Sequence, residues 1–112
     1  MRSNPKRLNP LQLRTLAILQ ALARERAFAD PPDRDGAVVI RTLPHAHGDH
    51  FHIGPAVVSA RDATGLGNPN VLSALARKGL LRGGPAGPPV LTAEGLAYET
   101  GIAAEILRGA DR

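Results

Sequence analysis

Residues 64–81 read TGLGNPNVLSALARKGLL and carry the clearest helix start and stop signals in the chain. Asn68 is placed to cap a helix with its side chain. Pro69 suits the first helical position because proline has no N–H group to leave unpaired there. Gly79 closes the segment, since glycine adopts the left-handed conformation at little cost. The stretch therefore predicts a helix over residues 69–78.

This helix has an apolar side and a polar side. Val71, Leu72 and Leu75 form the apolar side. Residues spaced i, i+3, i+4 and i+7 share one stripe of a helix, and here they are Asn70, Ser73, Ala74 and Arg77. Asparagine and arginine side chains suit the recognition of base edges and phosphates. The polar side is thus a candidate surface for nucleic acid.

The residues that follow predict two short strands and another helix. Residues 80–82 indicate a strand, 83–89 form a loop of glycine and proline, and Val90-Leu91 indicates a second strand. Residues 93–107 have apolar residues at helical spacing and predict a last helix. Helix, strand, glycine-rich loop, strand and helix is the order found in a winged helix.

At this point the chain resembles a known family. The string TGLGNPNVLSALARKGLL, followed by VLTAEGLAYE, is similar to winged helix-turn-helix proteins of the MarR and PadR type. In these proteins LxxKGLL leads into the wing and LTxEG leads out of it. The resemblance covers residues 55–99. One departure is Arg61, which stands where the family pattern has a small buried alanine, so the angle between the two helices of the motif is in question.

The resemblance implies an α+β fold, a winged helix-turn-helix that binds double-stranded DNA as a transcriptional regulator. We expect Asn70, Ser73 and Arg77 to face the major groove, and Arg82 to lie along phosphate with the wing. The full set of residues expected at the DNA is Asn68, Asn70, Ser73, Arg77, Lys78 and Arg82. The alternative function is protein–protein contact without DNA binding, because the wing is uncharged and the helix face has one arginine.

The chain before this motif adds elements that a plain winged helix lacks. Residues 1–8 are basic and without periodicity, so we expect a flexible arm, and a domain over 9–112. Asn9 and Pro10 mark the start of a helix over residues 11–27. Residues 37–43 and 51–53 predict two strands that could pair as a hairpin, an extra strand or hairpin before the second helix. That second helix is expected over residues 55–63.

The terminal helices also suggest how the chain assembles. Both predicted helices, 11–27 and 93–107, have wider apolar faces than a thin core can cover. We therefore expect a homodimer built on these helices, which would place two recognition helices on successive major grooves.

Composition sets limits on function. The 112 residues suggest one domain, and a net charge of +4 fits a polyanionic partner without proving one. The chain has no cysteine, which excludes disulfides, thiolate metal sites and cysteine catalysis. Aromatic residues make up 3%, which argues against a base-stacking platform for single strands. No apolar run is long enough to span a membrane, so we expect a cytoplasmic protein with no membrane partner.

All four histidines lie within residues 45–52. The string His45-x-His47-x-Asp49-His50 matches the metal-binding motif of the metallo-β-lactamase superfamily. That dinuclear site also needs a histidine and an acidic residue from later strands, and no histidine follows His52. No other catalytic set is visible, and the chain is not expected to be an enzyme.

A simpler metal site remains open. His45, His47, Asp49 and His50 could bind Zn²⁺ or Ni²⁺, because imidazole and carboxylate are ligands that these ions accept. The alternatives are a solvated hairpin tip and a proton sensor, since clustered histidines titrate near neutral pH. No other cofactor is expected.

Overall fold

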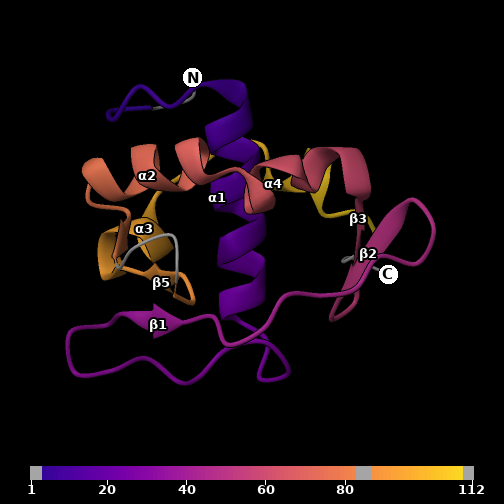
Figure 1. Cartoon of the computed structure of the whole chain (residues 1–112), viewed down its shortest axis with the longest axis horizontal. Coiled ribbons are helices and arrows are strands. Elements are labelled where there is room, and N and C mark those ends of the chain that lie inside the picture. Colours follow the sequence, from indigo (N-terminus) through magenta and orange to yellow (C-terminus); the bar gives the residue numbers. More distant parts are fainter. Residues whose placement is uncertain (1–3, 83–86, 110–112) are drawn as a thin grey trace.

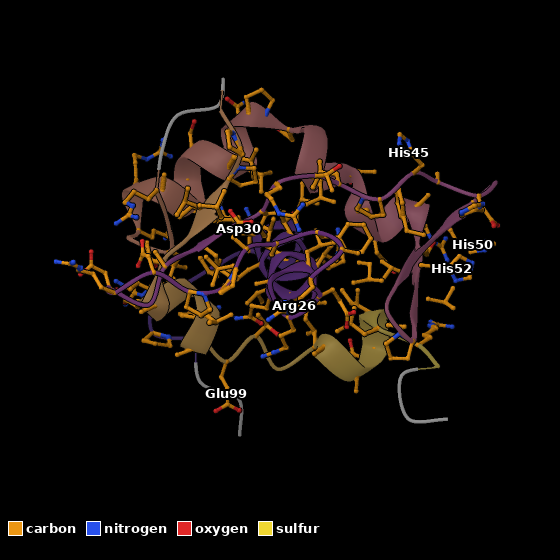
Figure 2. All side chains as sticks on the ribbon, turned by 90° about the horizontal axis from the view of Figure 1, so that it is seen from below. Arg26, Asp30, His45, His50, His52 and Glu99 are labelled. Atoms are coloured by element: carbon orange, nitrogen blue, oxygen red, sulfur yellow. The ribbon has the colours of Figure 1, made fainter. Side chains whose placement is uncertain are left out.

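The fold is built around helix α1 (Pro10–Ala23), which runs through the middle of the molecule (Figures 1 and 2). The computed structural model describes residues 4–82 and 87–109. Asn9 caps α1 as expected: its Oδ1 accepts the Gln12 N–H at 2.8 Å, and the Gln12 side chain accepts the Asn9 N–H at 3.0 Å. The helix ends at Ala23, earlier than residue 27, because the N–H groups of Arg24 and Glu25 turn back onto Ala21 and Leu22.

Nine shorter elements follow α1 among the described residues. They are β1 (Val38–Val39), β2 (His50–Ile53), β3 (Ala56–Ser59), the 3-10 helix η1 (Ala60–Gly67), α2 (Pro69–Arg77), β4 (Leu81–Arg82), β5 (Val90–Leu91), α3 (Ala93–Ala97) and α4 (Ala103–Ile106). The class is α+β, with helices and two small antiparallel sheets, as the sequence predicted. The radius of gyration of 12.9 Å is that of a compact chain of this length.

The three-stranded sheet has the order β1-β5-β4. Leu91 of β5 lies opposite Val38 on one side and Leu81 on the other, so β5 is the central strand. The predicted hairpin between residues 37–43 and 51–53 is therefore wrong, because the first of these segments pairs with β5 instead. Only two of its residues, 38 and 39, form the strand.

A hairpin does precede η1, but it is formed by β2 and β3. Gly54 has φ 56° and makes the turn with Pro55, which suits a two-residue loop that begins with glycine. The helix expected over residues 55–63 is wrong for the same reason: Pro55 completes a turn and does not start a helix. In β3 the alternate residues Ala56 and Val58 are buried, the two-residue period of a strand.

Helix α2 agrees closely with its prediction. Asn68 caps it by accepting the Asn70 N–H at 3.0 Å, Pro69 occupies the first turn, and Gly79 has φ 80° just beyond the end. The helix stops one residue early, so that Lys78 is its C-cap. One residue was placed on the wrong side: Ala74, expected in the polar stripe, is 6% exposed and belongs to the buried face.

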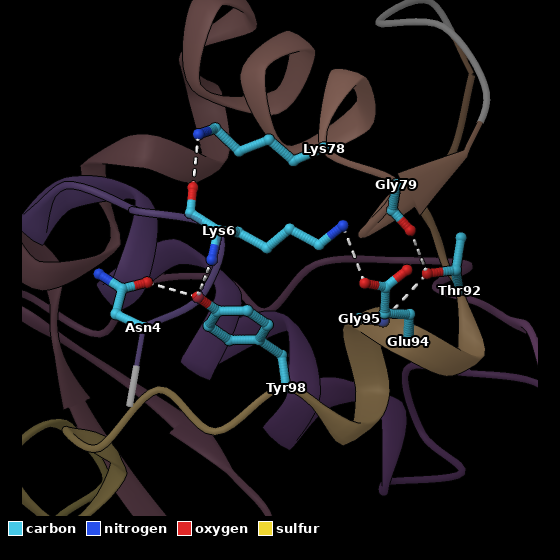
Figure 3. Close-up of polar contacts among 8 residues, drawn as sticks. All are labelled: Asn4, Lys6, Lys78, Gly79, Thr92, Glu94, Gly95 and Tyr98. Atoms are coloured by element: carbon cyan, nitrogen blue, oxygen red, sulfur yellow. Dashed lines mark hydrogen bonds and ion pairs between the residues drawn. The ribbon is translucent and has the colours of Figure 1, made fainter. Parts of the chain in front are cut away.

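The segment before α1 is packed against the domain from residue 4 onward, in contrast to the expected arm. Leu8 is buried at 4% exposure and joins the hydrophobic core. The Lys6 N–H donates to the Tyr98 hydroxyl at 3.1 Å, and that hydroxyl donates to Asn4 Oδ1 (Figure 3). Tyr98 thus fixes this segment from the far end of the chain.

The single helix expected over residues 93–107 is instead two short ones, α3 and α4. Tyr98 leaves the helix in an extended conformation, and Gln20 of α1 stabilises the break by donating to the carbonyls of Gly95 and Tyr98, at 2.8 and 2.7 Å. The break turns Tyr98, Ile102 and Ile106 into the shared core.

The homodimer was expected because the terminal helices were predicted to leave apolar side chains uncovered, and the described residues show no such uncovered face. Their one large hydrophobic side chain that is exposed is Leu43, at 40%. A homodimer stays a prediction, without the support that the helical faces were expected to give it. None of the helices in residues 4–82 and 87–109 combines the length and apolar character needed to cross a bilayer.

The contact between α1 and η1 depends on one glycine. A Cβ atom on Gly65 would overlap Thr15 Oγ1 and lie 3.2 Å from Thr15 Cβ. Thr15 is fully buried, and its hydroxyl donates to the Leu11 carbonyl at 2.8 Å, so it has no room to move aside. Gly67, two residues later, has nothing within 4 Å of the same position.

We predict that Gly65→Ala lowers the free energy of unfolding by about 1–3 kcal/mol, because it overpacks the α1–η1 contact. Gly67→Ala is the matched control and should change stability by less than about 0.5 kcal/mol. Urea unfolding followed by circular dichroism measures both. Thr15→Ala should rescue part of the Gly65→Ala loss, and strictly additive effects would contradict this account.

Candidate nucleic-acid interface and histidine hairpin

The outer surface of α2 presents two of the residues expected at DNA. Asn70 and Arg77 are exposed, and Ser73 between them is half-buried. Val71 and Leu75 are buried on the other side, which fixes the orientation of the helix. Asn70 and Arg77 are seven residues apart in an α-helix, or about 10 Å along its axis. The structure therefore places both side chains on one accessible surface.

Asn68 is the N-cap residue of α2. Its Oδ1 is occupied by the N–H of Asn70, which satisfies a free donor at the start of α2. This is the capping function that its position before Pro69 predicted.

Lys78 is also engaged within the molecule. Its Nζ donates to the carbonyl oxygen of Lys6 at 2.6 Å, and the Lys6 ammonium forms an ion pair with Glu94 at 2.9 Å (Figure 3). Lys78 thereby ties the N-terminal segment to the end of α2. The sequence placed Lys78 among the residues expected at DNA but could not indicate this partner, which is 72 positions away in the chain.

Arg82 is paired with a carboxylate. Its Nη2 lies 3.4 Å from Asp33 Oδ2, and the two side chains are 55% and 46% exposed, so the pair is screened by solvent and weak. Asp33 also accepts the backbone N–H groups of Ala37 at 3.0 Å and Asp35 at 2.8 Å. These hydrogen bonds, the one from Ala37 first, and then the charge of Arg82 lower the pKa of Asp33 below its usual 3.8.

The second polar site, here called the histidine hairpin, consists of the turn at residues 47–50 and the start of β2. His50 and His52 lie on the same face of β2, and their Nε2 atoms are 3.2 Å apart. His47 joins them from across the turn: its ring centroid is 5.5 Å from that of His52 and 6.3 Å from that of His50. The Asp49 carboxylate lies 3.4 Å from His50 Nδ1.

This grouping differs from the predicted metal set of His45, His47, Asp49 and His50. His45 lies apart from His50 and His52 (Figure 2), while His52, which the set omitted, is central. The two-residue period of the strand at residues 50–53 is the signal that pairs His50 with His52. In the described part of the chain, no three His, Cys, Asp or Glu side chains are arranged to hold one metal ion.

No family model, curated protein or solved structure gave a significant match to this chain. The similarity to MarR and PadR winged helices therefore rests on the sequence motifs, and it stays a prediction.

A third feature is a cleft of about 450 Å³ between α1, η1 and α4. Its polar lining is mixed in charge and consists of Arg14, Arg61, Asp62, Glu105 and Arg108. Arg14 Nε is buried in this region without a hydrogen-bond acceptor, and the Asp62 carboxylate oxygen Oδ1 lies 3.9 Å from it. Arg61, the departure from the family pattern, is exposed at this cleft and is not packed between helices.

The Asp33 environment makes a testable prediction. Its depressed pKa means that this group contributes stability above its unfolded pKa, and that the contribution is lost as pH falls through the folded value. A carboxyl ¹³C titration should give Asp33 a midpoint below 3.8, and the Ala37 amide shift should follow the same curve. Asp33→Asn should abolish the amide titration. A midpoint at or above the usual value would contradict the hydrogen-bonded loop.

Proposed function

We propose that the chain is a winged helix that binds double-stranded DNA through α2, as a cytoplasmic transcriptional regulator. The order of its elements supports the proposal. Helix α1 precedes β1, η1 and α2 follow, and β4 and β5 close the sheet in the order β1-β5-β4. We interpret this order as a helix-turn-helix followed by a wing, in which η1 takes the place of the second helix and the β2–β3 hairpin is an addition before it. The wing tip at residues 83–86 lies outside the described residues.

The observation that carries the proposal is the exposure of Asn70 and Arg77 on the outer surface of α2. Arginine can bind guanine and asparagine can bind adenine through two hydrogen bonds each, and a good pair discriminates by about 1–3 kcal/mol. Their separation of about 10 Å along the helix corresponds to roughly three base-pair steps of about 3.4 Å. Both side chains can therefore reach base edges within one major groove.

Contacts to the DNA backbone come from residues around α2. The Lys78–Lys6 hydrogen bond brings the N-terminal segment beside the end of α2, and the next residue, Arg7, is exposed. Arg7 is thus placed to contact phosphate beside the end of α2, where Lys78 is engaged within the chain. Arg82 can bind phosphate if it leaves Asp33, which costs little because that pair is solvent-screened.

One observation favours a second function, protein–protein contact through the same surface. Lys78 and Arg82 both have partners within the chain, which leaves Arg77 as the one cation of the predicted interface without a partner among the described contacts. A partner protein needs fewer cations at its interface than a DNA backbone does. The two functions differ in their dependence on salt.

Fluorescence anisotropy with random and selected duplexes, over a salt series, tests the DNA proposal. Arg77→Ala should weaken binding to the selected duplex by about 5- to 150-fold and relax its specificity, because a bidentate base contact is lost. Arg24→Ala is the matched control. Arg24 is an exposed arginine at the C-terminal end of α1 and is not among the residues expected at DNA. Absence of duplex binding by the folded wild-type protein at low salt would contradict the proposal and favour a protein partner.

The Asp33–Arg82 pair gives an independent prediction. Asp33→Asn keeps an oxygen acceptor for the loop but releases Arg82, so affinity for all duplexes should rise to a similar extent. Arg82→Ala should weaken all duplexes and reduce the salt slope by about one unit. When Arg82 is already replaced by alanine, Asp33→Asn should no longer raise the affinity for duplexes, apart from the long-range effect of the removed negative charge. A gain of the same size in the presence and absence of Arg82 would show that the pair is irrelevant to binding.

A further inference from the structure

We propose that His47, in the turn that leads into β2, and His50 and His52, in β2 itself, form a binding site for a divalent transition metal ion such as Zn²⁺ or Ni²⁺. The site uses none of the α2 residues, and it does not depend on the proposed function. It differs from the set that the sequence pattern suggested, because His52 replaces His45 and Asp49 supports a ligand without being one.

The separation between two imidazole nitrogens is the first argument. His50 Nε2 and His52 Nε2 face each other at 3.2 Å. Two nitrogen ligands at about 2.05 Å from a tetrahedral Zn²⁺ ion lie about 3.3 Å from each other. The strand therefore holds both ring nitrogens close to the spacing of a metal chelate. The ion would lie beside the line that joins the two nitrogens, so both rings have to turn until their lone pairs point at it, while the spacing of the nitrogens stays nearly the same.

The environment of His50 is the second argument. Asp49 Oδ1 lies 3.4 Å from His50 Nδ1, on the side of the ring away from His52. A carboxylate in this place favours the tautomer that carries its proton on Nδ1, which leaves the Nε2 lone pair free for a metal ion. Carboxylate–histidine–metal arrangements of this kind orient the ligand and increase its basicity.

His47 supplies the third ligand. Its backbone N–H donates to the His50 carbonyl at 2.7 Å, which holds the two arms of the turn together. Its ring is inclined at 65° to that of His52, at a centroid distance of 5.5 Å. In the part of the chain that the structure describes, no three metal-ligating side chains converge on one point, so His47 must rotate toward the other two rings. The His47 side chain is exposed and can do so, with water completing the coordination.

The ligand type determines which ions fit. Three neutral imidazoles without a direct carboxylate suit Zn²⁺, Ni²⁺ and Cu²⁺, whereas Mg²⁺ and Ca²⁺ prefer oxygen ligands. Mg²⁺ is therefore a negative control that keeps the charge of the ion and changes its chemistry.

The test uses the full chain without a polyhistidine tag, stripped of metal by a chelator that is then removed. Calorimetric titration with Zn²⁺ and with Ni²⁺ should show about one ion per chain, and titration with Mg²⁺ none. His47→Ala, His50→Ala and His52→Ala should each abolish this binding or weaken it more than Asp49→Asn does. Asp49→Asn itself should weaken it by about 10- to 100-fold, as expected for a residue that supports a ligand. His45→Ala is the matched control within the same cluster and should bind like the wild type.

Circular dichroism of each metal-free variant shows whether the domain is folded. The melting temperature of the wild type should rise with Zn²⁺, while that of folded His50→Ala should not, because only a folded site stabilises by binding. The proposal is overturned by absence of binding to Zn²⁺ and Ni²⁺, by equal losses in His45→Ala and His50→Ala, or by unchanged binding in His47→Ala. A stoichiometry of half an ion per chain with dimer formation would also overturn it, since the ion would then join two chains.

Discussion

The complete burial of the second half of α1 is the constraint on which the rest of the structure depends. Eight consecutive residues, 15–22, are buried, so every side of the helix needs a neighbour. An amphipathic helix needs cover on one side alone, whereas this one is packed by η1, α2, α3, α4 and β5. The two polar residues in the stretch, Thr15 and Gln20, both have hydrogen-bond partners, as burial of polar groups requires.

Local features were predicted well because their causes lie within a few residues. The caps at Asn9 and Asn68 and the left-handed Gly79 depend on hydrogen bonds and torsions of the adjoining turn. The same local signals failed where a distant partner decided the outcome. Pro55 begins a helix in many sequences, but here Gly54 before it allows a turn. Residues 93–107 have the spacing of one helix, yet Gln20 supplies the hydrogen bonds that let the chain break after Ala97.

In the candidate interface, too, local features were predicted and contacts with distant residues were not. Helical periodicity was enough to place Asn70 and Arg77 on the outer surface of α2. It could not show that Lys78 binds the Lys6 carbonyl or that Arg82 meets Asp33, because these partners are 72 and 49 positions away in the chain. Among the histidines, sequence proximity suggested a set that included His45. Strand geometry selected His52 instead, since alternate residues of β2 share a face.

The topology of the three-stranded sheet has a kinetic consequence. β1 pairs with β5 across the whole of the β2–β3 hairpin, η1 and α2, although each strand has two residues. A pairing of this kind closes a long loop for few hydrogen bonds, and such contacts form slowly. The hairpin and the capped helices involve near neighbours and can form early. We therefore expect the elements with their own sequence signals to form first, and the sheet that joins the two halves of the chain to form last.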